Sequence, residues 1–370
     1  MDRPTILLNP GPVTITERVR ASLQKEDMCH REPDFAQLML DIKQRLVRIY
    51  QDSAEEYESI IMSGSGTCAV EAMISSFLPK DGKLLIISNG VYGERIAKMV
   101  ETHGKQSVMI KSAWPEAMNL EEAERLLKSD KEITHVSAIH NETTTGRLND
   151  LDTLGALCKK YDKPMLLDAV SSFAGERIEY EKWNVAALAS TANKCIHGIP
   201  GLNFVIARRD LLEEGTSAAA TLYLDLYAYY EKQKDGFSPF TQATHVAVAL
   251  QEALKEMEEM GGWKARHARY REISERIRAE LDTMGITRFL NEEDYSSMLS
   301  SFHLPEGYTY EELHDELRKS GFIIYAGQGG LFHQIFRIAN MGDIFDSDVD
   351  RLLDVFRRLT SAAGRSSTRA

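Results

Sequence analysis

Short apolar runs rich in Val, Ile and Leu alternate with amphipathic helical stretches over residues 68–207 of the chain. A strand that is apolar on both faces has to be covered on both faces, so this alternation predicts a mostly parallel β-sheet with helices on either side. The predicted strands are Leu84–Ser88, Ser107–Ile110, Thr134–Ile139, Pro164–Asp168, Val185–Ser190 and Leu202–Ala207. The predicted helices are Cys68–Phe77, Gly93–His103, Leu120–Lys128 and Leu151–Tyr161. The pattern therefore predicts an α/β fold.

The pattern changes at about residue 244. Two long helical stretches, Thr244–Met260 and Trp263–Met284, are separated by two glycines. Predicted strands and helices then follow, namely Leu299–Leu304, Tyr310–Lys319, Phe322–Tyr325, Gln334–Ile338 and Ser347–Thr360. This order is typical of a small α+β domain. The expected divisions are a large domain at residues 15–250, a small domain at residues 251–362 together with residues 1–14, and a disordered tail at residues 363–370.

The charge balance narrows the possible functions. The 370 residues include 44 Lys and Arg against 56 Asp and Glu, a net charge of −12, which argues against a nucleic-acid binder and against attraction to anionic membranes. No uncharged apolar run approaches the roughly 18 residues of a membrane span, and the N-terminus has no signal-peptide pattern. The four cysteines are far apart, and the histidines lack metal-ligand spacing, so neither a disulfide framework nor a metal site is indicated. Reduced thiols predict a cytoplasmic protein.

The Gly/Ser loop Met62–Thr67 precedes a predicted helix. Its glycines let the backbone approach an anion, the helix N-terminus supplies free N–H groups, and Ser65 and Thr67 add hydroxyls. One interpretation is therefore a phosphate site, and the alternative is a loop that only caps the helix.

Two further residues follow predicted strands. Asp168 ends an apolar run at the sheet edge where open α/β folds bind ligands, or it is an acid satisfied by the backbone. Lys194 lies among small residues, where poor solvation would lower its pKa and make the amine nucleophilic; the alternative is an exposed loop lysine. Together, a phosphate site, a strand-end Asp and a Lys 26 residues later are what pyridoxal phosphate needs, because the Lys holds the cofactor as a Schiff base and the Asp pairs with its pyridine nitrogen.

Longer motifs carry a family resemblance over nearly the whole chain, from about Leu7 to Phe356. The matching segments are Leu8–Val13, Cys29–Pro33, Gly64–Thr67, Asn89–Arg95, His140–Gly146, Asp168–Ser172, Ala192–Cys195 and Phe336–Ile338. In these segments the chain resembles the class V aminotransferases of the fold type I pyridoxal-phosphate superfamily. Within that family it looks most like the 2-aminoethylphosphonate–pyruvate transaminases, chiefly through His140–Gly146, Ala192–Cys195 and Arg337–Asp343.

The resemblance implies a role for each site residue. Lys194 would form the internal aldimine and move protons between substrate and cofactor, and Asp168 would bind the pyridinium nitrogen. Arg337 would bind the substrate carboxylate, while Arg31 is a candidate second cation for an anionic head group or else pairs with a neighbouring acid. The implied cofactor-binding residues are Ser65, Gly66, Thr67, Tyr92, Thr143, Asp168, Val170, Asn193, Lys194 and Thr241, the last of them on the phosphate of the neighbouring subunit in a homodimer.

The implied reaction belongs to phosphonate metabolism: ping-pong transfer of an amino group from 2-aminoethylphosphonate to pyruvate, giving phosphonoacetaldehyde and L-alanine. Two segments depart from the family pattern, since Phe240–His245 replaces a Thr-Pro-Pro-Thr stretch and Gly327–Leu331 lacks the lysine typical of phosphonate transaminases. The alternatives are an alanine–glyoxylate or serine–glyoxylate aminotransferase, a lyase on the same scaffold, and a non-catalytic protein that kept the fold. The intact pair of Lys194 and Asp168 argues against the last of these.

Overall fold

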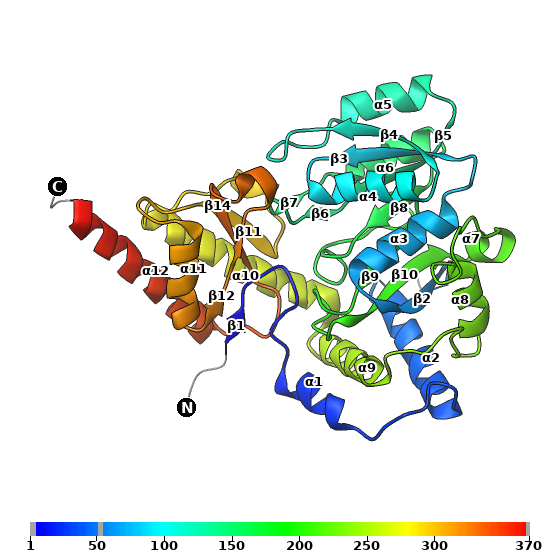
Figure 1. Ribbon diagram of the computed structural model, residues 1–370, viewed down its shortest axis with the longest axis horizontal. Helices are drawn as coiled ribbons and strands as arrows, with labels where there is room; N and C mark the ends of the chain where they lie inside the picture. Colours follow the sequence, from blue (N-terminus) through cyan, green and yellow to red (C-terminus); the bar gives the residue numbers. More distant parts are fainter. Residues whose placement is uncertain (1–4, 51–54, 368–370) are drawn as a thin grey trace.

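A seven-stranded sheet forms the centre of the larger part of the molecule (Figure 1). The computed structural model describes residues 5–50 and 55–367, with side chains to Ser361. In spatial order the strands are β2 (Tyr57–Gly64), β10 (Gly201–Arg208), β9 (Val185–Thr191), β8 (Met165–Asp168), β5 (Ile133–Ile139), β3 (Lys83–Ser88) and β4 (Gln106–Lys111). Strand β10 is antiparallel to both of its neighbours, and every other neighbouring pair is parallel. The predicted α/β class with a mostly parallel sheet is confirmed.

Side chains on the two faces of this sheet enter two separate apolar cores. Along β3, Leu84 and Ile86 belong to one core and Leu85 and Ile87 to the other, as expected for strand residues that alternate between faces. The helices over the first face are α3 (Gly66–Phe77), α4 (Val91–Thr102), α7 (Arg209–Glu214) and α8 (Leu226–Gln233). The helices over the second face are α2 (Pro33–Arg48), α5 (Leu120–Ser129), α6 (Leu151–Lys160) and α9 (Thr244–Glu259). Because both faces are buried, the inner strands of the sheet are mainly apolar, whereas the edge strand β4 is mostly exposed.

The C-terminal part is built on a smaller antiparallel sheet. Its strands, in spatial order, are β11 (Leu299–His303), β14 (Ile335–Ala339) and β13 (Tyr325–Ala326). A third apolar core lies between this sheet and helices α10 (Gly262–Thr283), α11 (Tyr310–Lys319) and α12 (Asp346–Ser367). The N-terminal strand β1 (Ile6–Leu7) pairs in parallel with β12 (Phe322–Ile323), so the first described residues join this part of the fold. The small α+β unit is confirmed as architecture, while its predicted domain bounds stay a prediction.

Three of the elements that differ from the prediction have a local explanation. Strand β2 was not predicted, because its apolar run is short and continues directly into the Gly/Ser loop. The single strand predicted at Phe322–Tyr325 is two strands, since the chain changes its pairing partner at Ile324, from β1 to β14. Helix α12 continues past its predicted end at Thr360 to Ser367. Residues 363–367 of the expected disordered tail are therefore helical, and residues 368–370 lie outside the described part of the chain.

A short hairpin, β6 (Asn141–Glu142) and β7 (Arg147–Leu148), follows β5 at the edge of the sheet where the parallel strands end. It borders the candidate site. A five-residue helix, α1 (Glu17–Ala21), packs on α9 near the N-terminus. Every helix among the described residues is too short or too polar to span a lipid bilayer.

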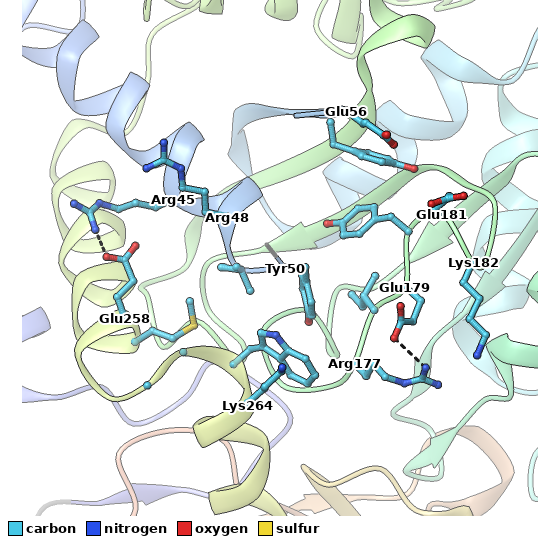
Figure 2. A pocket seen from close by; sticks show the side chains of 18 residues that line it. Arg45, Arg48, Tyr50, Glu56, Arg177, Glu179, Glu181, Lys182, Glu258 and Lys264 are labelled. Carbon is cyan, nitrogen blue, oxygen red and sulfur yellow. Dashed lines mark hydrogen bonds and ion pairs between the residues drawn. The ribbon is translucent and has the colours of Figure 1, made fainter. Parts of the chain in front are cut away.

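A pocket of about 800 Å³ opens at the opposite edge of the sheet, where Tyr57 begins β2 (Figure 2). Two ion pairs join charged side chains that line it: Arg45 with Glu258, and Arg177 with Glu179 at 3.1 Å (Figure 2). None of the residues predicted for cofactor or substrate lines this pocket. The candidate active site is therefore separate from it.

Candidate active site

The residues predicted for catalysis meet at one edge of the sheet. Asp168 is the last residue of β8, Lys194 follows the end of β9 at Thr191, and Gly64 ends β2 beside the loop that begins α3. These three strands run in the same direction, so their carboxyl ends reach the same edge, which is where open α/β sheets bind ligands. The structure thus brings together Asp168, Lys194 and the Gly/Ser loop.

Asp168 is a buried carboxylate with few partners. It is 6% exposed, and the backbone N–H of Val170 donates to its Oδ1 at 2.9 Å. Burial raises the pKa of Asp168 to about 6, while the charges of Arg95 and Lys194 lower it. A carboxylate enclosed in this way favours a cationic hydrogen-bond donor as its ligand.

Lys194 lies under the N-terminal segment of the chain. Its Nζ donates to the carbonyl oxygen of Pro10. The next residue, Gly11, has φ of +94°, and a Cβ there would lie 2.6 Å from Cδ of Lys194. Burial lowers the pKa of Lys194 to about 8, and the charge of Arg337 adds to this effect. At pH 7 a pKa near 8 leaves about one-tenth of the molecules with a neutral amine, far more than for an ordinary lysine, and the neutral amine is the form that acts as nucleophile or base.

The contact of Pro10 and Gly11 with Lys194 was missed by sequence reasoning. The motif Leu8–Val13 was noted without a role, because nothing local links it to a lysine so far along the chain. Its signal was a glycine between two prolines, which indicates a backbone that must take an unusual conformation. Pairing of β1 with β12 carries this segment to the edge of the large sheet.

The Gly/Ser loop begins helix α3. Ser65 is the N-cap residue, its side chain makes no capping hydrogen bond, and both Ser65 and Thr67 are exposed. A Cβ on Gly66 would lie 2.7 Å from Cγ1 of Val170, so a glycine is needed for α3 to approach the loop after Asp168 this closely. The first turn of α3 therefore offers free N–H groups and two hydroxyls to an anion, and this turn packs against the loop that follows Asp168.

Tyr92 and Arg95 lie one turn apart in α4 and face this loop. The Cζ atom of Arg95 lies 4.8 Å from the ring centroid of Tyr92, and its Nη1 donates to Oγ1 of Thr67 at 3.3 Å. Arg95 is thus a cation beside the predicted phosphate site at the first turn of α3. The sequence analysis gave it no role. Its spacing of three residues from Tyr92 was the available signal, because side chains at i and i+3 share a helix face.

Arg337 reaches the site from β14 of the smaller sheet. Its side chain is 2% exposed, with Nε donating to the carbonyl oxygen of Ala326 at 2.8 Å and Nη1 donating to that of Thr143 at 2.6 Å. Burial lowers its pKa. None of the ion pairs in the described residues includes Arg337, so its positive charge remains available for an anionic ligand.

Three predicted site residues have few contacts with the rest of the candidate site. Asn193 is half-buried beside Lys194 and accepts a hydrogen bond from the hydroxyl of Thr191 at 2.9 Å. Arg31 is exposed in the turn before α2, and Thr241 is exposed in the loop before α9. Across residues 5–50 and 55–367, no hydrogen bond or ion pair joins Arg31 or Thr241 to the residues around Lys194. Their roles stay predictions.

The donors and acceptors of this edge fit pyridoxal phosphate. The first turn of α3 suits the phosphate, the buried carboxylate of Asp168 suits a protonated ring nitrogen, and the amine of Lys194 suits the aldehyde. Within the part of the chain that the structure describes, no three His, Cys, Asp or Glu side chains converge on a metal position.

Comparison with known proteins agrees with this geometry. The family description "Aminotransferase class-V" matches residues 17–341. A 2-aminoethylphosphonate–pyruvate transaminase of Bacillus mycoides is 40% identical over 94% of this chain and 96% of its own length. A bifunctional phosphonoacetaldehyde hydrolase/aminoethylphosphonate transaminase of Clostridioides difficile is 40% identical over 95% of this chain, which spans only 56% of that longer protein.

Solved structures give the same result. The alanine–glyoxylate aminotransferase of a Nostoc species superimposes with a TM-score of 0.88 and 25% identity, over 97% of this chain and 96% of that one. The family model, the relatives and the solved structure together confirm the prediction of a pyridoxal-phosphate-dependent transaminase. The chain belongs to the class V aminotransferase family.

Proposed function

We propose that this enzyme transfers the amino group of 2-aminoethylphosphonate to pyruvate, giving phosphonoacetaldehyde and L-alanine in a ping-pong reaction. The observation that carries the proposal is Arg337, a buried guanidinium without a carboxylate partner whose charge acts on Lys194. Relatives named for this reaction, at 40% identity over nearly the whole chain, support the choice of substrate.

The chain's own residues would divide the work. When bound, the cofactor supplies an electron sink for the carbon that bears the amino group. Asp168 would hold a proton on the ring nitrogen, and Ser65, Gly66 and Thr67 would hold the phosphate. Lys194 accepts the proton from the amine-bearing carbon through Nζ, which its lowered pKa makes available.

The remaining predicted residues complete the pocket in this proposal. Tyr92 and Val170 would pack on the two faces of the ring, Thr143 would lie near its hydroxyl, and Asn193 would contact the phosphate. Arg337 binds the carboxylate of alanine or pyruvate in one half-reaction and the phosphonate in the other. A phosphonate carries more charge than one guanidinium neutralises, so Arg31 is proposed as its second cation.

We also propose a homodimer in which Thr241 contacts the phosphate bound by the neighbouring subunit. The loop that carries Thr241 is anchored beside the phosphate seat, since the backbone N–H of Ala243 donates to Oγ of Ser63 at 3.1 Å. Close by, the hydroxyl of Tyr223 donates to the carbonyl oxygen of Ser63, and Leu222 is 76% exposed. Exposed apolar surface beside a binding site supports coverage by a second copy. The free cysteines of the described residues support a cytoplasmic location.

One observation favours the alanine–glyoxylate or serine–glyoxylate alternative. The segment Gly327–Leu331 places Gln328, a neutral amide, with its Oε1 3.2 Å from Oγ1 of Thr144 near the site. A Cβ on Gly329 would lie 2.9 Å from the ring of Trp114, so this segment packs closely in place. A substrate whose only anionic group is a carboxylate needs no cation from the segment Gly327–Leu331. A phosphonate substrate would bind better if this segment supplied one.

A donor screen with the holoenzyme separates the two functions. The donors are 2-aminoethylphosphonate, taurine, alanine and β-alanine, each with glyoxylate and all except alanine also with pyruvate, and Lys194→Ala serves as the inactive control. The proposal predicts the highest kcat/KM for 2-aminoethylphosphonate with pyruvate. A higher kcat/KM for alanine with glyoxylate, and none for the phosphonate, would establish the alternative.

A further inference from the structure

The hairpin β6–β7 places a fully buried carboxyl group under the first turn of α4. Glu142 has no exposed surface, and its Oε1 accepts hydrogen bonds from the backbone N–H of Thr144 at 3.0 Å and from its hydroxyl at 2.6 Å. Its Oε2 is buried without a hydrogen-bond partner among the described residues. The backbone N–H of Tyr92 is close enough to lower the pKa of Glu142, although it makes no hydrogen bond of normal geometry.

Gly90 is matched to this carboxyl group. A Cβ on Gly90 would lie 2.1 Å from Cδ and 2.4 Å from Oε2 of Glu142, so any other residue would displace the carboxyl group. Gly90 is also the N-cap of α4 and supplies no side-chain cap. The cap comes from the hairpin instead, because the backbone N–H of Val91 donates to Oγ1 of Thr144 at 3.2 Å.

The second residue of the helix capped in this way is Tyr92. A shift of the first turn of α4 therefore moves the aromatic ring directly. The carboxyl group also lies at the positive end of the helix dipole, which favours its position there. Between Glu142 and Thr144, the carbonyl oxygen of Thr143 fixes the guanidinium of Arg337. The segment from Glu142 to Thr144 thus contacts both the helix turn that carries Tyr92 and the guanidinium of Arg337.

We propose that Glu142 is a positioning residue which, through Thr144 and the first turn of α4, sets Tyr92 against the cofactor ring. The role does not depend on which amino donor the enzyme uses. Asp168 and Arg337 are the charged groups that act on Glu142 from β8 and β14, and burial raises the pKa of Glu142 to about 7. An amide at this position keeps the Oε1 acceptor that Thr144 needs, so Glu142→Gln tests shape apart from charge.

The test measures binding of pyridoxal phosphate to the apo-protein by fluorescence quenching, and the visible circular dichroism of the bound cofactor. Glu142→Ala is expected to weaken binding about tenfold and to reduce the dichroism, as expected when a buried hydrogen-bonding group is lost. Glu142→Gln should restore most of both. The matched control is Glu101→Ala, a carboxylate at the exposed end of the same helix that pairs with Lys98, and it should change neither.

A double-mutant cycle with Tyr92→Ala assigns the pathway. If Glu142 acts through Tyr92, adding Glu142→Ala to Tyr92→Ala should weaken binding less than about twofold further. An equal loss in both backgrounds, or wild-type binding in Glu142→Ala, would overturn the proposal. Should Glu142→Ala not fold, Thr144→Val carries the same test, since it removes the acceptor of the Val91 N–H and should also reduce the dichroism; unchanged dichroism in that variant would overturn the proposal as well.

Discussion

The guanidinium of Arg337 acts on the amine of Lys194, because its charge adds to the burial that lowers the pKa of Lys194 to about 8. The two residues come from different sheets, Arg337 from β14 and Lys194 from the loop after β9. Hydrogen bonds to two backbone carbonyls fix the guanidinium. A nucleophilic amine beside a fixed guanidinium suits a substrate with an amine or carbonyl at one end and an anion at the other.

Gly11→Ala should disturb Lys194 more than it disturbs the fold. The new Cβ would meet the lysine side chain at 2.6 Å, so the amine would shift. We expect kcat to fall by roughly 100-fold, the loss typical of a misplacement of about 1 Å. The control is Gly104→Ala, which has φ of +65° but no atom within 4 Å of the new Cβ. Equal kcat values for the two variants would contradict the close contact with Lys194.

Asp168→Asn should remove a pH dependence from the stability of the apo-protein. Burial raises the pKa of Asp168 from 3.8 to about 6, so between these values the folded protein binds a proton that the unfolded chain has lost. The contribution of Asp168 to the free energy of unfolding is fully present below about pH 4 and decreases by roughly 3 kcal/mol as the pH rises through about 6. Urea unfolding of both apo-proteins from about pH 4 to 7 should show the variant gaining stability relative to the wild type. A difference that stays constant with pH would refute the burial of this carboxylate.

The catalytic edge of the sheet was predictable because its residues follow directly from strand ends. Asp168 and Lys194 each come after an apolar run, and parallel strands bring such positions to one edge. The contact of Gly11 with Lys194 was not predictable, because it depends on the pairing of β1 with β12. Strand β2 escaped notice for a local reason, since its apolar run merges with the Gly/Ser loop.

Two residues near the site could not be assigned a role from the sequence. Arg95 and Glu142 both lie inside motifs that were noted, yet their partners come from other elements: Thr67 on α3 for Arg95, and Gly90 before α4 for Glu142. Periodicity identifies which face a residue lies on, and it does not identify what packs against that face.

Arg95→Met should weaken binding of pyridoxal phosphate more than binding of pyridoxal. Arg95 donates to the hydroxyl of Thr67 beside the phosphate seat, and its charge is unmatched by any ion pair in the described residues. We expect about tenfold weaker binding of the phosphorylated cofactor, the usual loss for one charged contact, and little change for pyridoxal. Fluorescence titration of the apo-protein measures both. Lys98→Met, on the exposed face of the same helix, is the control, and equal losses for the two ligands would mean that Arg95 acts only through Tyr92.

Arg31→Ala and Arg337→Lys should affect the two half-reactions differently. Arg337 serves both substrates, and lysine cannot reproduce its bidentate geometry, so Arg337→Lys should raise KM for the phosphonate and for alanine. If Arg31 meets the second phosphonate charge, Arg31→Ala should raise KM for 2-aminoethylphosphonate by about 10- to 150-fold and leave alanine nearly unchanged. Stopped-flow measurement of each half-reaction gives the separate constants. Equal changes for both substrates would make Arg31 a structural residue.

The most direct test of the account is a single half-reaction. Holoenzyme is mixed with 2-aminoethylphosphonate in the absence of any keto acid, and the visible absorption band of the bound cofactor is recorded. We expect the band to disappear with formation of one equivalent of phosphonoacetaldehyde, and to return on addition of pyruvate with one equivalent of L-alanine. An unchanged band with the phosphonate, together with loss of the band on addition of alanine or serine, would contradict the proposed substrate while leaving the aminotransferase family intact.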